Sequence, residues 1–267
     1  MPRREGTGGM QPAQLRIVDT RDEPLNGAMM VVGFPTHGLV GSVAASYLVH
    51  TLDMNLIAYM VSEEFPPTVI MEEGVVSAPV RFYASKLVCG VDRSCDQLVV
   101  VIADIQPPVE MLNALGRALL DWVEAKHVQL LVAIEGQPIE SEVTGDARVV
   151  ALANRAAAPL LDKYRLEAAN GVITGLAGGI LLGAIGRSTP VLCLVAQAHK
   201  DYPDARAAAK VIETINPLVP LIVLDTKPLR EKAREIEGEV RRTLQKTRES
   251  MATMRSPDPE GPGEMYR

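Results

Sequence analysis

Short apolar runs alternate along this chain with longer segments of helical pattern. Apolar runs bounded by turn residues predict β-strands at 28–34, 55–62, 79–84, 98–105, 128–134 and 190–196. Several are apolar at nearly every position, as expected for strands that are covered on both faces. Helical periodicity predicts helices at 38–52, 109–126, 147–161, 174–186, 204–216 and 229–254. This alternation is typical of a mostly parallel sheet flanked by helices.

The segment 69–84 departs from the alternation. It contains Met71-Glu72-Glu73-Gly74-Val75, which predicts the turn of an antiparallel hairpin. We therefore predict an α/β fold, a three-layer α/β/α sandwich with a mostly parallel or mixed sheet, followed by a long C-terminal helix and a flexible tail. The expected boundaries are an N-terminal extension at 1–25, a core domain at 26–226, the helix at 227–254 and the tail at 255–267.

The last predicted helix differs from the others in its narrow apolar stripe and dense charge. Pro228 is suited to the first turn, where a missing N–H costs nothing. The stripe comprises Leu229, Ala233, Ile236, Val240, Leu244, Thr247, Met251 and Met254. Spacings of four and three residues keep such a stripe nearly straight along the helix axis. The pattern is consistent with a helix docked on its own domain and with one that projects or pairs with another copy.

An uncharged segment at 168–186 is long enough to span a membrane. Its many glycines, together with Asn170 and the following Arg187, favour a buried helix that leads into a buried strand. Gly175, Gly179 and Gly183 are four residues apart and form a small-residue face. We expect this face to let another backbone approach closely, within the subunit or across an interface.

Composition narrows the possible functions. The net charge of -6 argues against nucleic-acid binding, because phosphate neutralisation needs clustered Lys and Arg. Cys89, Cys95 and Cys193 lack CxxC spacing, so we predict neither a disulfide framework nor a metal site, and a reducing cytoplasm as the location. Cys193 lies in an apolar strand and should be buried and inert. The N-terminus has no apolar signal segment, so secretion is not expected.

The turn at 33–41 follows a predicted strand and opens a helix, where α/β proteins bind phosphates. It does not match a P-loop, because Leu39 and Val40 replace the required Lys and Ser or Thr. Nor does it match GxGxxG, because Gly33 and Gly38 are five residues apart. Close packing between strand and helix explains its glycines better, and we predict no cofactor.

One alternative interpretation is an α/β enzyme with a pocket at Gly33–Gly41. His37 would act as a base with a carboxylate from a strand end, and the candidates are Glu63, Glu64, Asp104 and Glu135. No spacing connects these residues into a catalytic motif. We therefore expect the protein not to be an enzyme.

Three segments carry a family resemblance: Val31-Val32-Gly33-Phe34-Pro35-Thr36-His37-Gly38-Leu39-Val40-Gly41, Glu63-Glu64-Phe65-Pro66-Pro67 and Thr174-Gly175-Leu176-Ala177-Gly178-Gly179. Together they resemble the proteasome assembly chaperone 2 family as found in archaea, over about residues 28–225. The resemblance implies an α/β/α sandwich that forms homo-oligomers, here a homotetramer, without established catalytic activity.

The last three residues, Met265, Tyr266 and Arg267, follow a proline- and glycine-broken tether at 255–264. Chain ends are usually where order is lost, so a partner's pocket explains an apolar and an aromatic residue here better than a core does. They fill the hydrophobic-tyrosine-any residue motif of archaeal proteasome activators. That resemblance implies ATP-independent docking into α-ring pockets of the core proteasome, followed by gate opening. A third interpretation is an assembly factor that contacts α subunits through its folded surface.

Overall fold

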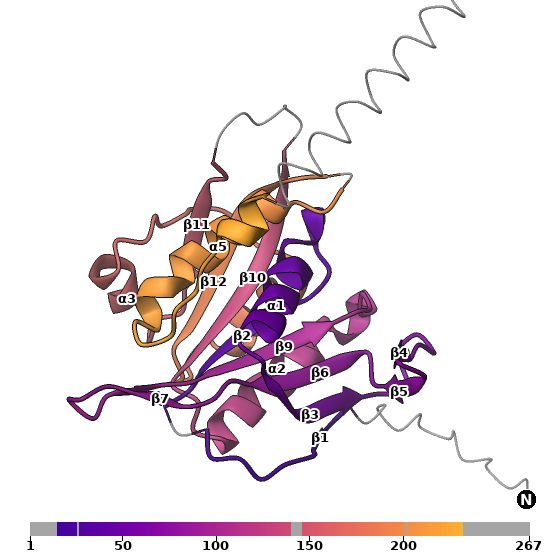
Figure 1. The fold of residues 1–267 in the computed structure, drawn as a ribbon. Coiled ribbons are helices and arrows are strands. Elements are labelled where there is room, and N and C mark those ends of the chain that lie inside the picture. The colour runs from indigo at the N-terminus through magenta and orange to yellow at the C-terminus, as the bar shows by residue number, and fades with distance from the viewer. Residues whose placement is uncertain (1–14, 26, 140–145, 201, 232–267) are drawn as a thin grey trace, which may run out of the picture.

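The computed structural model describes residues 15–25, 27–139, 146–200 and 202–231, and its centre is a mixed sheet (Figure 1). In the described residues this sheet has 8 strands in the order β1-β3-β6-β9-β2-β10-β12-β11. The strands are β1 (Arg16–Asp19), β2 (Met29–Gly33), β3 (Asn55–Val61), β6 (Val80–Ala84), β9 (Leu98–Ala103), β10 (Leu130–Ile139), β11 (Val149–Ala153) and β12 (Val191–His199). Neighbours β9, β2, β10 and β12 run parallel, and the outer strands pair antiparallel. The predicted α/β fold with a mixed sheet is confirmed.

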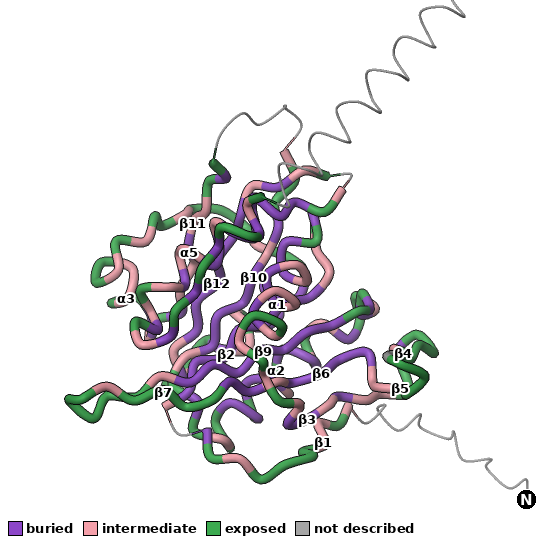
Figure 2. Tube along the Cα trace, in the orientation of Figure 1, coloured by how far each residue is buried: buried purple, intermediate pink, exposed green. Residues whose placement is uncertain are grey.

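Helices cover both faces of the sheet, which makes the three predicted layers. Helices α1 (Val40–Thr51) and α5 (Ala205–Ile215) pack on one face, seen in front in Figure 1. Helices α2 (Leu112–Ala125) and α4 (Gly175–Gly183) pack on the other. The central strands are buried almost throughout (Figure 2), because each face meets a helix layer. The remaining helical elements are η1 (His37–Leu39), η2 (Val109–Met111), α3 (Ala158–Lys163) and η3 (Asn216–Leu218).

Glycines permit two close approaches that the sequence predicted. A Cβ on Gly33 would lie 2.3 Å from the Gly41 carbonyl oxygen, so β2 packs directly on α1. A Cβ on Gly179 would lie 2.7 Å from the Leu112 carbonyl oxygen, so the small-residue face of α4 packs against α2 within the subunit. Both contacts would be lost with any side chain larger than hydrogen.

The predicted helix at 147–161 is wrong in its first half. Residues 149–153 form β11, which pairs antiparallel with β12 along the sheet edge. The helix begins only at Ala158, after Asn154. Asn154 is buried, donates to the carbonyl oxygens of Ala184 and Thr189, and accepts from the amides of Ala157 and Val191. Pairing with an open sheet edge outweighed local helix preference.

Two hairpins extend from the sheet. The hairpin predicted within 69–84 is confirmed as β4 (Ile70–Glu72) and β5 (Val75–Ser77). The second, β7 (Val88–Cys89) and β8 (Cys95–Asp96), was not predicted.

The prediction that the cysteines form no disulfide needs correction. Cys89 and Cys95 are bonded across the β7–β8 hairpin, with an S–S distance of 2.06 Å. They are register partners on opposite strands, and cross-strand partners have their Cβ atoms close together. Spacing alone did not show that a hairpin turn lies between them. Cys193 is buried, as predicted, and burial raises the pKa of its thiol.

The uncharged segment contains α4, which packs on α2 and the sheet. Within the described ranges, the structure has no helix of the length and apolar character needed to cross a bilayer.

The chain turns helical again at residues 227–231, next to the predicted start at Pro228. We call residues 226–231 the helix root. Arg230 fixes it to the core: Nε and Nη2 donate to Glu213 at 2.6 and 2.7 Å, and Nη1 donates to Asp146 at 2.8 Å. The Thr226 hydroxyl also donates to Glu213. The rest of the predicted C-terminal helix lies outside the described residues.

Candidate functional site

The sheet has a switch point between β2 and β10. From β2 the chain continues through α1 to β3, which lies toward the β1 edge of the sheet. From β10 the chain continues to β11 and β12, which lie at the opposite edge. Connections that leave in opposite directions open a crevice at the carboxyl ends of the two strands, where α/β proteins bind ligands.

A pocket of about 790 Å³ occupies this crevice, and we call it the edge pocket. Its walls are formed by residues after β2, by the end of β10, by β11 and by the loop that leads into α4. Most of the lining is apolar, and it includes Phe34, Leu112, Leu152, Ile173, Leu176 and Val195. This size and character fit a small organic ligand.

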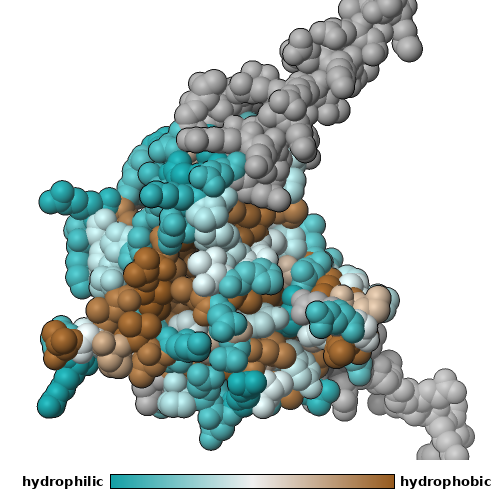
Figure 3. Space-filling view, viewed as in Figure 1, coloured by the Kyte–Doolittle hydropathy of each residue, from teal (hydrophilic) through white to brown (hydrophobic). Residues whose placement is uncertain are grey.

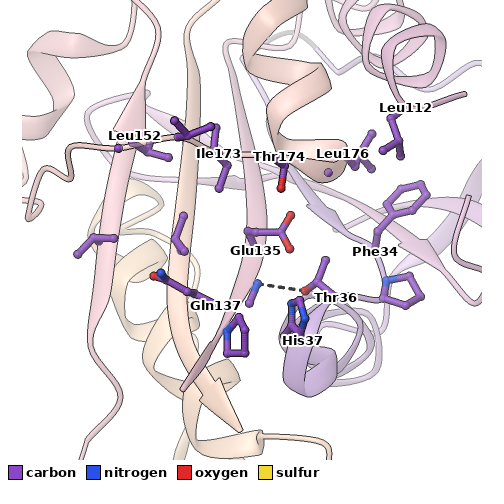
Figure 4. A pocket seen from close by; sticks show the side chains of 18 of the residues that line it. Phe34, Thr36, His37, Leu112, Glu135, Gln137, Leu152, Ile173, Thr174 and Leu176 are labelled. Atoms are coloured by element: carbon purple, nitrogen blue, oxygen red, sulfur yellow. Dashed lines mark hydrogen bonds between the residues drawn. The ribbon is translucent and has the colours of Figure 1, made fainter. Parts of the chain in front are cut away.

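Glu135 lies in the middle of the edge pocket (Figure 4), with its carboxyl group between the start of α4 and the turn after β2. It is the first residue of β10 beyond those paired with β2, whose last partner pair is Ile134 with Gly33. A Cβ placed on Gly175 would lie 3.6 Å from Glu135 Oε2. The carboxyl group therefore faces the first turn of α4 directly.

The turn after β2 is locked onto β10. The backbone amide of Gly136 donates to the Thr36 hydroxyl at 3.1 Å. A Cβ on Gly136 would lie only 2.0 Å from the His37 carbonyl oxygen, so only glycine permits this contact. The next two residues, Gly38 and Leu39, have φ of 62° and 47°, and this left-handed turn starts α1 beside the pocket.

Burial raises the pKa of Glu135 to about 7. Hydrogen bonds from the Gly136 amide and the Thr36 hydroxyl act in the opposite direction and only partly offset the lost hydration. None of the ion pairs among the described residues includes Glu135. A half-buried carboxyl group without a cation is therefore the central polar feature of this pocket.

Of the five residues in the alternative enzyme interpretation, the structure brings together His37 and Glu135, which both line the edge pocket. Glu63 and Glu64 are exposed in the loop after β3, and Asp104 pairs with Arg81 at 2.9 Å. None of these three lines the pocket. The hydrogen bonds of the described residues do not join His37 to Glu135.

Sequence reasoning missed several pocket residues, among them Thr36, Gln137, Leu152, Ile173 and Thr174. Thr36 follows β2, and Gln137 follows the predicted strand at 128–134, although it lies within β10 in the structure; a position just after a predicted strand is a usable signal. The others come from β11, which was predicted as helix, and from the loop before α4. The described residues contain no group of three or more His, Cys, Asp or Glu side chains that could hold a metal ion.

A second surface feature lies on the β7–β8 hairpin and the segment after α5. Apolar side chains are exposed at Leu87, Val91 and Val223, the last of them 83% exposed. A Cβ on Gly90 would lie 3.5 Å from Leu221, so the hairpin and this segment are in contact. Figure 3 shows apolar surface gathered on this face of the molecule. Patches of this kind often mark contact surfaces.

Met265, Tyr266 and Arg267 lie outside the described residues.

Known proteins resemble this chain along most of its length. Uncharacterized protein MJ0106 of Methanocaldococcus jannaschii is 23% identical over 247 residues, which are 92% of this chain and 97% of the relative. The crystal structure of Pyrococcus furiosus PbaA, an archaeal homolog of proteasome-assembly chaperone, has 27% identity and a TM-score of 0.73, covering 90% of this chain and 95% of PbaA.

Pyrococcus furiosus PbaB, an archaeal proteasome activator, has the same fold, with a TM-score of 0.74 at 24% identity. The match covers 86% of this chain and 98% of PbaB. The model of the PAC2 family matches residues 30–244, which include all of β2 except Met29, the later strands of the sheet and the edge pocket. This chain belongs to the PAC2 family.

Proposed function

We propose that this protein is an ATP-independent proteasome activator or assembly chaperone. In this proposal its C-terminal tails dock into the α-ring pockets of the core proteasome and promote gate opening. The observation that carries the proposal is the combination of a PAC2 domain with a Met265-Tyr266-Arg267 ending. The likeness to PbaA and PbaB supports the choice of the proteasome as partner.

The tail has the chemistry of a docking peptide. Tyr266 offers a large apolar ring with a polar tip, and only two rotatable bonds lose freedom when the ring is held. A terminal carboxylate adds charge-assisted hydrogen bonds with a cation such as lysine. Capture of a terminal carboxylate is a recurrent mode of peptide recognition.

One tail alone is too small to hold a large complex, because association itself is costly. Several tails on one oligomer bind much more strongly, since each later insertion is intramolecular and raises avidity by about 100-fold or more. We therefore propose a homo-oligomer, by family resemblance a tetramer. If the ten residues 255–264 form a random coil, they would reach roughly 17 Å, enough for each tail to search for its pocket.

The helix root supports this arrangement. Arg230 holds the start of the C-terminal segment on α5 through two hydrogen bonds to Glu213 and one to Asp146. Paired bonds from one guanidinium to one carboxylate fix direction as well as position. Each tail would then begin from a defined point on the core.

The test moves the terminal carboxylate without changing any side chain. Adding one alanine after Arg267 should abolish stimulation of peptide hydrolysis by purified core proteasome, and Tyr266→Ala should do the same. Arg267→Ala is the matched control, because the third place of the motif accepts any residue and the carboxylate stays in register. Docking by the terminus is wrong if the extended protein and Tyr266→Ala both stimulate as well as the parent.

The exposed apolar surface at Leu87, Val91 and Val223 favours a second candidate, an assembly factor that binds α subunits through its folded surface. A variant that ends at Met254 separates the two functions. Full proteasome binding by that variant would support the folded surface, whereas loss of binding would support the tail. Light scattering of the same variant would show whether the oligomer survives the truncation.

A further inference from the structure

We propose that the edge pocket binds a small organic cation, an ammonium group on an apolar body, with the ammonium held by Glu135 and the body by the apolar walls. The site lies at the switch point of the sheet and does not depend on the C-terminal tail. It adds a ligand-binding function to the proposed action on the proteasome, and each proposal can fail without the other.

The first argument is the missing counter-charge. Three other partly enclosed carboxylates in the described residues have cation partners: Asp19 has Lys126 at 2.6 Å, Asp104 has Arg81 at 2.9 Å, and Glu213 has Arg230. Glu135 is more buried than Glu213 and has no such partner. A buried charge without a counter-charge is costly. A cation that enters the pocket could therefore form an ion pair with Glu135 that no residue of the fold supplies.

The other charged or titratable groups around Glu135 do not fill this role. His37 from η1 and Lys200 beyond β12 line the pocket, and both are exposed. Neither forms a recorded hydrogen bond or ion pair with Glu135 within the described ranges. Cys193 of β12 lies close enough for the charge of Glu135 to raise its pKa, but its buried thiol carries no positive charge.

The second argument is the wall around the carboxyl group. Leu152, Ile173 and Leu176 approach from the side of β11 and α4, while Phe34 and Leu112 approach from the side of β2 and α2 (Figure 4). An apolar body of several carbon atoms can bury against them once the ammonium is paired. An inorganic cation would leave these walls in contact with water, which makes an organic cation the better match.

Other ligand classes fit less well. An anion, including a nucleotide phosphate, would place negative charge against Glu135, and the turn at 33–41 has none of the phosphate-binding spacings. A neutral molecule could contact the walls, but it would leave the ionised carboxylate without a counter-charge.

The experiment compares three probes of equal length: hexylammonium, 1-hexanol and hexanoate. Isothermal titration calorimetry on the full chain at pH 8 should give saturable binding of hexylammonium, at least tenfold tighter than 1-hexanol, and no binding of hexanoate. Glu135→Gln should weaken hexylammonium binding at least tenfold and leave the weak binding of 1-hexanol nearly unchanged. Glu63→Gln, which removes an exposed carboxylate outside the pocket, is the matched control and should bind like the parent.

The dependence on pH gives a second readout that a purely structural role would not move. With the pKa of Glu135 at about 7, the ionised fraction rises about tenfold between pH 6 and pH 8, and hexylammonium affinity should rise by the same factor. Glu135→Gln should flatten this profile. His37→Gln should retain it, which separates the carboxyl group from the imidazole.

A further variant locates the ligand. Leu152→Phe adds volume to the pocket wall without touching the carboxyl group, and it should weaken hexylammonium binding while Glu135 remains. Thermal unfolding of each variant shows that the fold is intact. The proposal is overturned if 1-hexanol binds as tightly as hexylammonium, if Glu135→Gln binds like the parent, or if hexylammonium does not bind at all.

Discussion

Glu135 and Glu213 are both partly buried glutamates, but Glu135 is the more buried of the two and lacks the cation partner that Glu213 has. Glu213 lies at the helix root with the guanidinium of Arg230 on its carboxylate, and this contact lowers its pKa. Glu135 lies in the edge pocket without a cation, and burial raises its pKa to about 7. Burial without a cation therefore raises the pKa of one carboxyl group, and a close guanidinium lowers the pKa of the other.

The two regions also take different parts in the proposals. The charged groups of the helix root are paired within the fold, and the root supports the segment that leads to the tail. The Glu135 carboxyl group in the edge pocket has no cation partner within the fold, and the pocket is open to solvent.

Removing residues 265–267 should have the largest effect. Proteasome stimulation should fall to the unstimulated rate, a loss of about tenfold or more, because the avidity of several tails disappears at once. Hexylammonium binding by the same protein should stay within about twofold of the parent, because the pocket is intact. A peptidase assay and calorimetry on one preparation measure both. A shared loss would mean that the tail and the pocket are coupled.

Gly136→Ala should disrupt the pocket end of the molecule. The added Cβ would lie 2.0 Å from the His37 carbonyl oxygen, so backbone must shift, at a cost of about 3 kcal/mol in unfolding free energy. Urea denaturation measures the change. Gln137→Ala, at the next and exposed position, should stay within about 0.5 kcal/mol of the parent. Equal stability of Gly136→Ala and the parent would contradict the close contact between β10 and the turn.

Glu135→Gln should stabilise the protein at pH 8 by about 1–3 kcal/mol. Because the pKa of Glu135 is higher in the folded state than the usual 4.5, the native state binds more protons, and stability falls as pH rises from about 4.5 to about 7. Glutamine removes this fall. Urea denaturation at pH 5 and pH 8 measures it, with Glu63→Gln as control. A parent and variant that differ equally at both pH values would show that Glu135 is not held as proposed.

Arg230→Met should lower the unfolding free energy, by less than Glu135→Gln raises it. Loss of the guanidinium should destabilise the protein by about 1–2 kcal/mol at pH 7, discounted because both side chains are about 30% exposed. The pKa of Glu213 is lowered in the folded state, so its contribution is present above about 4.5 and is lost as pH falls through the folded pKa. The gap between variant and parent should therefore narrow in acid. Lys227→Met, at an exposed position nearby, should change little.

Much of the fold could be predicted from local pattern. The continuous apolar runs of the central strands and the clear stripe of α2 left few alternatives, and the close-packing glycines at Gly33 and Gly179 fell where predicted. The failures share a cause. Strand β11 and the β7–β8 hairpin depend on a neighbouring strand for their structure, and the local sequence does not determine which strand that is.

The sequence by itself determined the alternation of strands and helices, the membership of the PAC2 family and the chemistry of the last three residues, because each is a property of adjacent positions. Only the tertiary structure decided that Glu135, of four candidate carboxylates, enters a pocket, and that Glu213 meets Arg230. Both outcomes depend on which distant segments meet. A charged side chain acquires its pKa and its partner only when the surrounding layers have excluded water.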